Sequence, residues 1–487
     1  MKKLNFTILL GLLCSLSGFT QTTYYWIGGV GPASFTSDNN WNTQLDGSGN
    51  SRGVNGSQYT DVLIFDGSNV GGTNPTTGNV FINASSDTMA RMIFQNNINL
   101  RFGRSSAGSS SISLQGDGSA LPDFVINAGC VVTLGDLSNF NVRILLGLPT
   151  VPGSVATGSV SGTLFISPLS QTSHTLSYVT SPAAGAMVFE PGGECHVNDS
   201  SSITPFNGSV NNSILFKPGA SLHYYGGRSP IGSSGTLQFA NFEAGSNFYV
   251  KGSNANPDGT LIYTGSSWTN QKSLANIFVQ NGAIFKADGT IYRIDSVTVD
   301  NGASFITHSS GQTPLLGNLV VNGIFGASSG SNGLVMGGHV PQSISGTGSI
   351  DIPNFVVANY SDVTLSSTIT VSSSSNIVGK INFGTTGRIA GAGSFTARVA
   401  STGASGTGSA TAGSYQLSFP APSSINGYAV SGPGLSPNTN VIGFGASANL
   451  IYLSKPALSS QAGTYSFTTD TATLQTANAN GFAPAAG

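Results

Sequence analysis

The sequence predicts an all-β protein: a right-handed parallel β-helix (β-solenoid) with an N-terminal cap and a small C-terminal β-module. A short phrase, in which a β-branched residue is followed closely by an Asn-Gly step, recurs at Val279–Gly282, Val299–Gly302 and Val321–Gly323. Its glycines are 20 and 21 residues apart. A fixed period of this size is typical of a solenoid, in which each repeat buries its apolar face against the next.

The composition supports a β-rich chain with few charges. Only 7% of the 487 residues are charged, against about 25% in an ordinary domain. The 66 glycines would suit a disordered chain, but the apolar residues gather in short strand-like clusters. The formal net charge is -2 and there is no basic patch, so the sequence predicts no nucleic-acid partner.

Residues 1–21 are predicted to be a cleaved signal peptide. Lys2 and Lys3 precede an apolar stretch from Phe6 to Leu16, and small residues follow. A buried N-terminal helix is the alternative interpretation. No later stretch has the length and apolarity of a membrane span, so none is predicted. The mature protein is therefore expected to be secreted or held on the outer cell surface.

Residues 22–75 are expected to form the N-terminal cap. The end of a solenoid exposes a sheet edge and an apolar core, and Trp26 and Trp41 are bulky enough to cover both. Aromatic faces also bind sugar rings, and on that alternative Trp26, Trp41 and Trp268 would be the binding residues. The sequence favours the cap.

Residues 76–400 are predicted to form the solenoid itself. Short strands with alternating apolar side chains, such as Val297/Val299 and Ile381/Phe383, are separated by Gly, Asn, Asp and Ser. The Asn-Gly and Asp-Gly steps provide corners with positive φ at low steric cost. With about 21 to 26 residues in each coil, the strand spacing predicts a rod on the order of 65 to 75 Å long.

Cys130 and Cys195 are the two cysteines that follow the leader, and each comes shortly after a glycine of the repeat. About three coils separate them, which is on the order of 14 Å at the strand spacing. A disulfide requires Cα atoms within about 7 Å. We therefore expect two free cysteines that pack as small hydrophobic residues.

The C-terminal part is expected to differ from the solenoid. Residues 401–414 are almost entirely Gly, Ser, Thr and Ala, which predicts a flexible linker. Five short apolar segments within 415–472 predict a small β-sandwich-like module. The tail, residues 473–487, is expected to be disordered.

Several segments resemble parts of known proteins. Tyr25–Gly29, the Asn40-Trp41 pair and Asp61–Phe65 resemble the start of large secreted β-helix proteins of Gram-negative bacteria, including autotransporter-like adhesins. Gln342–Ile350 and the strands after it resemble a unit of surface proteins exported by type IX secretion, and 415–467 is similar to a small repeat of surface and fibre proteins. The resemblance implies export and architecture. Type IX cargo usually ends in a sorting β-domain, which the last residues do not resemble.

Parallel β-helices also include polysaccharide lyases and glycoside hydrolases. A lyase needs a base and a cation, and a hydrolase needs two carboxyl groups about 5 to 9.5 Å apart. The densest group of candidates is Lys286, Asp288, Tyr292, Arg293, Asp295 and Asp300. Solvated corners with a loose Arg–Asp pair explain the same residues, and this interpretation is favoured. No catalytic residue is assigned; the candidates are Asp288, Arg293, Asp295 and Glu194.

Glu190, Glu194 and His196 form a second group, in which Glu194 and His196 share one strand face. A metal site needs three or more ligands, and no spacing motif supplies them, so neither a metal nor a cofactor is predicted. The other histidines are expected to be isolated at the surface or at corners; they are His174, His223, His308 and His339.

The function predicted from these observations is a non-catalytic structural or adhesive role outside the cell. The expected partners are surface glycans or other cell-surface proteins, which would contact broad polar faces of the rod. The alternatives are a carbohydrate-active β-helix enzyme, either a polysaccharide lyase or a glycoside hydrolase, and a glycan-binding protein without catalysis.

Overall fold

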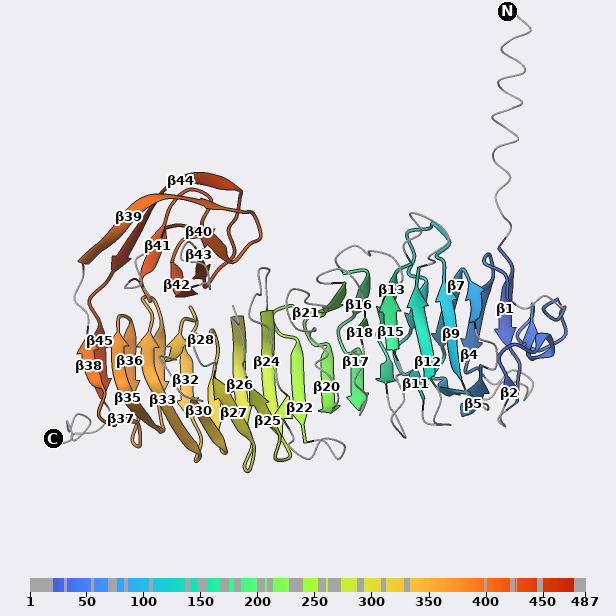
Figure 1. The fold of residues 1–487 in the computed structure, drawn as a ribbon, viewed down its shortest axis with the longest axis horizontal. Coiled ribbons are helices and arrows are strands. Elements are labelled where there is room, and N and C mark those ends of the chain that lie inside the picture. The colour runs from blue at the N-terminus through green and yellow to red at the C-terminus, as the bar shows by residue number, and fades with distance from the viewer. Residues whose placement is uncertain are drawn as a thin grey trace, which may run out of the picture.

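A computed structural model shows an elongated stack of strands with a smaller lobe beside its C-terminal part (Figure 1). The structure describes residues 21–29, 33–53, 57–68, 77–82, 86–104, 108–135, 141–147, 156–166, 175–178, 185–198, 206–207, 213–226, 240–252, 260–261, 273–286, 293–307, 312–327, 333–397, 401–420, 425, 427–444 and 450–476. The protein is all-β, with long parallel sheets and one small closed antiparallel barrel. The described residues include a single short helix, the 3-10 turn η1 (Asp38–Asn40).

The N-terminal half contains two separate sheets in which the strands follow one another in sequence order, except that β3 (Trp41–Asn42) lies at the edge of the first sheet, beside β1 (Thr23–Trp26). The nine-stranded sheet is parallel except for the pairing of β1 with β3, and it consists of β1 (Thr23–Trp26), β3 (Trp41–Asn42), β4 (Val62–Asp66), β7 (Arg91–Gln95), β10 (Phe124–Ile126), β13 (Gly158–Val160), β16 (Met187–Phe189), β19 (Ile214–Phe216) and β21 (Ala240–Phe242). The five-stranded parallel sheet consists of β6 (Ser86–Met89), β9 (Ser109–Leu114), β12 (Asn141–Leu146), β15 (Thr175–Tyr178) and β18 (Phe206–Asn207).

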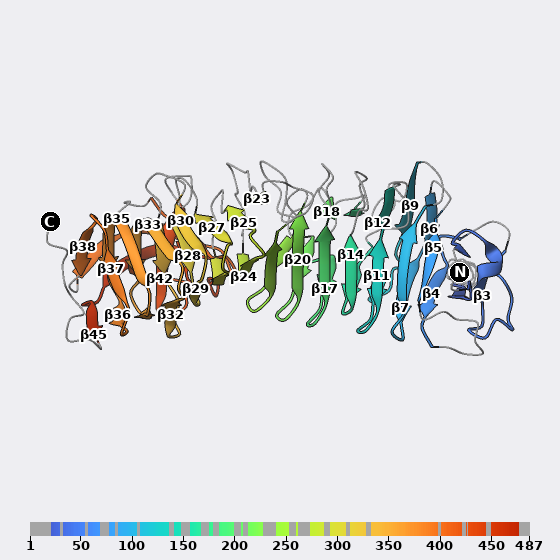
Figure 2. The same ribbon diagram turned by 90° about the horizontal axis from the view of Figure 1, so that it is seen from below.

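A third, long sheet runs the whole length of the stack with parallel pairings (Figure 2). Its first strands are β2 (Ala33–Ser34), β5 (Thr77–Phe81), β8 (Asn99–Gly103), β11 (Val131–Leu134), β14 (Thr163–Ile166), β17 (Glu194–Asn198), β20 (Ser221–Gly226), β22 (Asn247–Lys251), β23 (Thr260–Leu261) and β24 (Ser273–Gln280). The later strands are β25 (Ile284–Lys286), β26 (Arg293–Val299), β27 (Ser304–Thr307), β28 (Gln312–Leu315), β29 (Leu319–Val321), β30 (Ile324–Ala327), β31 (Gly333–Met336), β32 (Gln342–Ser345), β33 (Ser349–Val357), β34 (Asp362–Leu365), β35 (Thr368–Ile377), β36 (Lys380–Phe383), β37 (Arg388–Ala390), β38 (Ser394–Ala397) and β45 (Thr473–Thr476).

The register brings like residues together. Phe285 pairs with Phe305, and Phe305 pairs with Phe325, so the pairing interval in this part of the chain is 20 residues. Their ring centroids are 5.1 and 5.0 Å apart. In the N-terminal half the interval is longer, as in the pairing of Met92 with Phe124.

The interior is one continuous apolar core that extends from Trp26 to Phe383. Alternate residues of each strand supply it, because successive side chains of a strand point to opposite faces. In β26, for example, Val297 and Val299 are buried while Thr298 between them is half-buried. The strand alternation predicted over this region is confirmed.

Glycines at the corners serve two different purposes. Gly282 and Gly302 have φ of 74° and 78°, as predicted for the Asn-Gly steps, and Asn281 also has a positive φ of 53°. Gly323 is required for close packing instead, because a Cβ atom there would lie 2.2 Å from the carbonyl oxygen of Ala303.

Both tryptophans of the predicted cap are buried in the core at the N-terminal end of the stack. Trp26 is 1% exposed and Trp41 is 0% exposed, and their rings meet edge to face with centroids 5.0 Å apart. The indole Nε1 of Trp41 donates a hydrogen bond to the carbonyl oxygen of Phe35 at 2.8 Å. These contacts suit rings that cover an apolar core.

The two cysteines are free and buried, as predicted. Burial raises the pKa of both thiols, and Cys195 is completely enclosed. Each therefore packs as a small apolar side chain.

The predicted linker is wrong. Ser401–Ala410 form β39, which pairs antiparallel with β44 (Gln461–Thr469). With β40 (Gln416–Ser418), β41 (Ala429–Ser431), β42 (Thr439–Phe444) and β43 (Leu450–Leu453) these strands close a six-stranded barrel, in place of the expected sandwich-like module. The five strands predicted within the module are all present.

The expectation of a disordered tail is also corrected in its first residues. After the barrel the chain returns to the long sheet, where β45 pairs parallel with β36 and aligns Leu474 with Ile381. The barrel is therefore an insertion between two strands of the long sheet. Residues 477–487 lie outside the described residues.

The barrel is fixed to the stack by a small interface of its own. Val335 and Val356 of the long sheet pack against Ile442 and Tyr452 of the barrel. A Cβ atom at Gly337 would lie 2.5 Å from Ile442 Cγ2, so a glycine is needed for this approach.

Asn359, in the turn that follows β33, binds three parts of the chain around the barrel. Its backbone N–H donates to the Gly427 carbonyl at 2.8 Å, and its carbonyl accepts from the Asn440 side chain. Its side chain exchanges hydrogen bonds with Asp470 at 2.8 and 3.1 Å. The barrel is therefore held in one orientation.

Replacement of a stacked core ring should destabilise the protein much more than replacement of an outward side chain in the neighbouring strand. We expect Phe305→Ala to lower the free energy of unfolding by about 3 to 5 kcal/mol, because it leaves a cavity between two other rings. The matched control Thr298→Ala should change it by less than about 0.5 kcal/mol. Urea denaturation followed by circular dichroism measures both, and equal losses would contradict the core assignment.

Candidate functional site

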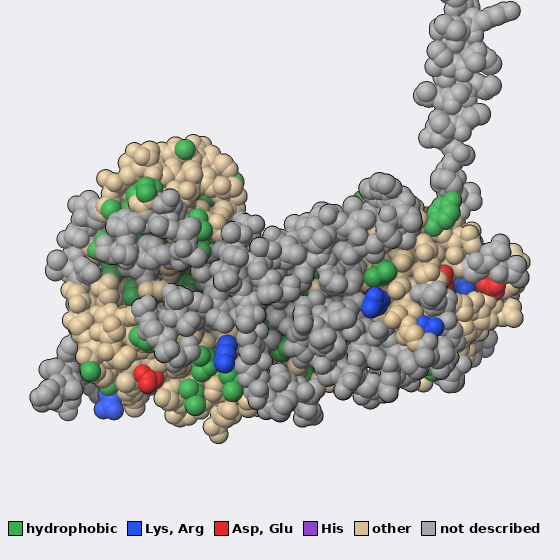
Figure 3. Space-filling view, in the orientation of Figure 1, with side chains coloured by type: hydrophobic (Ala, Val, Ile, Leu, Met, Phe, Trp, Pro, Cys, Tyr) green, Lys and Arg blue, Asp and Glu red, His purple; other side chains and the backbone are tan. Residues whose placement is uncertain are grey.

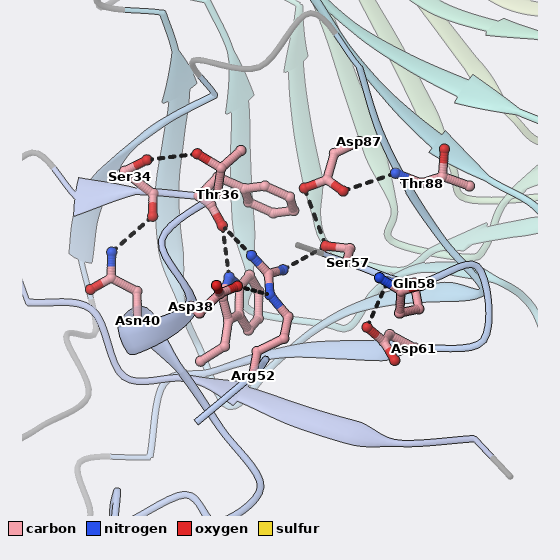
Figure 4. Close-up of polar contacts among 12 residues, drawn as sticks. Ser34, Thr36, Asp38, Asn40, Arg52, Ser57, Gln58, Asp61, Asp87 and Thr88 are labelled. Carbon is pink, nitrogen blue, oxygen red and sulfur yellow. Dashed lines mark hydrogen bonds and ion pairs between the residues drawn. The ribbon is translucent and has the colours of Figure 1, made fainter. Parts of the chain in front are cut away.

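A buried charged network lies at the N-terminal end of the stack (Figure 4). Arg52, with a side chain 1% exposed, donates from Nε to Asp38 at 3.1 Å and from Nη2 to the Phe35 carbonyl at 3.2 Å. Its Nη1 donates to Ser57, whose hydroxyl donates to Asp87 at 3.1 Å. The guanidinium also lies over the Trp41 ring, 5.5 Å from its centroid.

Two carboxyl groups beside this network have perturbed acidities. Burial raises the pKa of Asp87 and of Asp61, although Arg52 attracts the ionised form of each. Raised carboxyl pKa values can mark a catalytic acid. Here, however, Asp87 accepts from Ser57 and from its neighbour's backbone, and Asp61 accepts from the backbone of Gln58. The network connects Arg52 and Ser57 to Asp87 in β6, and these contacts indicate a structural role.

A serine and a histidine meet where the barrel contacts the stack. His339 Nε2 lies 2.7 Å from Ser454 Oγ, and burial, with Lys455 nearby, lowers the pKa of His339 to about 4. Ser454 is only 5% exposed and also accepts a hydrogen bond from the Asn440 backbone at 2.8 Å. The pair therefore fastens the barrel. His339 is not isolated, as the sequence predicted, but half-buried in this interface.

The most unusual surface feature is a ladder of rings on the outer side of the long sheet, which we call the aromatic ladder. It crosses strands that lie side by side in Figure 2 and consists of Phe165, His196, His223, Tyr249 and Phe278. Successive ring centroids are 4.3, 4.3, 4.5 and 4.6 Å apart, with interplanar angles of 29°, 11°, 3° and 14°. All five side chains are half-buried.

Ring stacking decides what the aromatic ladder can bind. Each of the three central rings has a neighbour on both faces, so the faces are already covered by other rings. The half-buried ring edges carry the imidazole nitrogens and the Tyr249 hydroxyl, and the Nδ1 atoms of His196 and His223 are buried. The ladder therefore offers hydrogen-bonding and metal-ligating atoms, whereas sugar stacking would require an open ring face.

A second ladder of polar side chains runs beside the first, two residues earlier in each strand. Asn247 donates to Ser221 at 3.4 Å, Asn276 donates to Asn247 at 3.2 Å, and Ser296 donates to Asn276 at 2.6 Å. Glu194 pairs in register with Ser221 at the end of this row.

Glu194, His196 and His223 come together where the two ladders meet. Glu194 Oε2 is 3.0 Å from His196 Nε2, and one ligating atom from each of the three residues lies within 4.8 Å of the others. Burial lowers the pKa of His196, and it lowers the pKa of His223 to about 4, with His196 and Lys251 adding to the effect. Both imidazoles are therefore neutral at pH 7 and can act as ligands or bases.

The structure describes only some of the other residues proposed from sequence. Asp288 and Trp268 lie outside the described residues, and Arg293 begins β26. Asp295 Oδ2 accepts from the Gly245 backbone at 3.0 Å, while Asp300 accepts from Gln280 at 3.2 Å. Both carboxylates thus hold turns or strand ends together. The buried Trp26 and Trp41 have no face open to a ligand.

The partnership of His196 with His223 and Tyr249 was not predicted from the sequence. Each of these residues comes four positions after a glycine with positive φ, at Gly192, Gly219 and Gly245. Alignment of the repeats on these glycines would have placed the three rings in one row. Phe278 breaks this rule because it precedes its glycine, so a single alignment could not have found the whole ladder.

Charged side chains are sparse on the described surface. On the face shown in Figure 3, most described atoms belong to uncharged polar side chains or backbone, with scattered charges between them. Two ion pairs of the long stack, Lys217 with Glu190 and Lys380 with Asp362, join neighbouring strand levels at 2.8 and 2.9 Å. No helix among the described residues has the length and apolarity required to cross a membrane.

Comparison of the chain with protein-family models, with curated proteins and with solved structures found no significant match.

Loss of the buried guanidinium should destabilise the N-terminal end of the stack. We expect Arg52→Gln to lower the free energy of unfolding by about 2 to 3 kcal/mol, less than a fully buried pair would lose, because water reaches Asp38. Arg388→Gln, at an exposed arginine, should change it by less than about 0.5 kcal/mol. Thermal denaturation measures both, and an unchanged Arg52→Gln protein would contradict the structural role.

The stacked imidazoles should make the protein sensitive to acid. The pKa of His223 is lower in the folded than in the unfolded chain, so between about pH 6.5 and pH 4 the unfolded chain binds the extra proton and stability falls as the pH falls. His223→Phe keeps the ring stack and removes the titrating group. Between pH 7.5 and pH 4.5 the free energy of unfolding of His223→Phe should therefore fall by about 1 to 2 kcal/mol less than that of the parent, after allowance for solvent screening.

Melting temperatures of both proteins at pH 7.5 and pH 4.5 measure the effect. Titrating groups that do not act on His223 are common to both proteins and cancel in the comparison. An identical loss in the parent and in His223→Phe would contradict the prediction.

Proposed function

We propose that the parallel sheets are the faces of a right-handed parallel β-helix. Residue pairing at a fixed interval of 20 residues through β25, β27 and β30, and one core that extends along the stack, support this arrangement. The hand is expected from the general rule that about 98% of parallel crossover connections are right-handed. Each interval would then be one coil of the helix.

We further propose that the protein is secreted or held on the cell surface, where it serves as a structural or adhesive rod. The observation that carries this proposal is the fixed docking of the barrel on an uninterrupted core, through Val335, Val356, Ile442 and Tyr452. A long stack with one packed core resists bending, and a docked lobe keeps its orientation on that stack. Such an arrangement suits presentation of the docked barrel and of the outer faces of the stack in a fixed orientation.

The outer ladders supply the contact chemistry of this proposal. Uncharged amides, hydroxyls and ring edges can exchange hydrogen bonds with glycans or with exposed protein surfaces at many equivalent levels. Because each contact is weak alone, useful affinity would require many such contacts at successive strand levels along the rod.

Two measurements test the proposal. In a Gram-negative host, the full chain should be exported with residues 1–21 removed, which intact-mass analysis of the exported protein would show. The purified protein should bind immobilised glycans or intact cells and should release no unsaturated or reducing ends from acidic and neutral polysaccharides. A protein without residues 1–21 is the control for export.

Release of such ends, lost in Glu194→Ala or Asp288→Ala, would replace the adhesive role by a carbohydrate-active enzyme. Retention inside the cell of the chain that carries residues 1–21 would contradict the proposed location.

A further inference from the structure

Three potential metal ligands are held together by the register of two neighbouring strands. In β17, Glu194 and His196 are two residues apart and so lie on the same face. Pairing of His196 with His223 of β20 then places the second imidazole directly beside the first. These positions are set by backbone pairing and by the buried residues between them, Cys195 and Leu222, and not by a flexible loop.

The hydrogen bond between two of the three residues marks where an ion would sit. His196 Nε2 donates to the Glu194 carboxylate at 3.0 Å, so an ion bound there would replace that proton, and the proton of the neutral ring would move to Nδ1. The Nδ1 atoms of His196 and His223 are buried without a hydrogen-bond partner among the described residues. The Glu194 side chain is 43% exposed and that of His196 is 12% exposed, so an ion can arrive from solvent. We propose that Glu194, His196 and His223 form a binding site for a borderline divalent transition-metal ion such as Zn²⁺.

The distances between the ligating atoms are near those of a zinc site, but one ring must reorient. Zinc bonds of about 2.0 to 2.2 Å in tetrahedral geometry separate neighbouring ligand atoms by about 3.3 to 3.6 Å. Glu194 Oε2 and His196 Nε2 are already 3.0 Å apart, and the His223 nitrogen lies within 4.8 Å of both. The two ring planes differ by 11°, so the His223 ring must turn out of the stack for its lone pair to point at the ion.

Two imidazoles and one carboxylate would leave the fourth position open to water or to an oxygen atom of an outside molecule. The set of ligands favours zinc or a neighbouring metal over calcium or magnesium, which prefer oxygen ligands alone.

The positive charge of a nearby lysine repels a bound cation, and its removal provides a further test. Lys251 Nζ is 3.2 Å from Tyr225 Oη and lies over the Tyr225 and Tyr249 rings at 5.1 and 5.6 Å from their centroids. Its positive charge acts on both imidazoles. Removal of this charge should therefore strengthen metal binding, while removal of a ligand should weaken it.

The experiment is calorimetric titration of the chelator-treated, purified protein with ZnCl₂. We expect one zinc ion per chain, with affinity more than about tenfold weaker in His223→Phe, which keeps the ring stack, and in Glu194→Gln, which keeps the side-chain shape. Lys251→Met should bind more tightly than the parent. Glu190→Gln is the matched control, because it removes a nearby carboxylate that is paired with Lys217, and it should bind as the parent does.

Cobalt provides an independent readout. Co²⁺ added to the parent protein should give visible absorption bands of a low-coordinate nitrogen and oxygen site, and His223→Phe should abolish them. Circular dichroism confirms that each variant is folded. Zinc binding of equal affinity in the parent, His223→Phe and Glu194→Gln, or the absence of saturable binding at one equivalent, overturns the proposal.

Discussion

Backbone hydrogen bonds between parallel strands place each residue beside its counterpart in the next strand, about 4.8 Å away. This spacing determines which side chains can occupy paired positions on neighbouring strands. Two like charges at about 4 Å repel by about 1 kcal/mol even in water, and by more where they are partly buried. Two aromatic rings at the same positions attract by about 0.5 to 1.5 kcal/mol beyond their burial. A stack built in this way therefore favours rings, amides and hydroxyls and excludes rows of one charge.

The charged residues that remain obey the same constraint. Lys217 lies one strand level from Glu190, and Lys380 lies one level from Asp362, so each joins opposite charges across neighbouring strands. The low charge of the sequence, 7%, agrees with this constraint. The same reasoning applies to the row Ser221–Asn247–Asn276–Ser296, where each amide or hydroxyl after Ser221 donates a hydrogen bond to the residue one strand level earlier.

The sequence predicts the strands and corners of the stack well, because period-two alternation and Asn-Gly steps are local signals. It fails at 401–410, where composition alone indicated a linker. The structure shows another reason for small residues there: Cβ atoms at Gly406 and Gly408 would lie 3.1 and 3.0 Å from the Phe419 ring. Glycine in this strand makes room for an aromatic side chain. Only the partner strand β44, which is distant in sequence but adjacent in space, distinguishes such a strand from a flexible segment.

The candidate site shows a similar limit. Glu194 and His196 could be paired from their spacing in one strand, but His223 belongs to another level, and its place depends on a corner that must first be aligned. Once aligned, the stack that stabilises the rod also sets the chemistry of the site. Burial between rings disfavours the charged imidazolium and lowers the pKa of His196 and of His223, so each ring favours its neutral form, in which one of its two nitrogens carries a proton. The packing that stabilises the stack thereby places two neutral imidazoles beside the half-exposed carboxylate of Glu194.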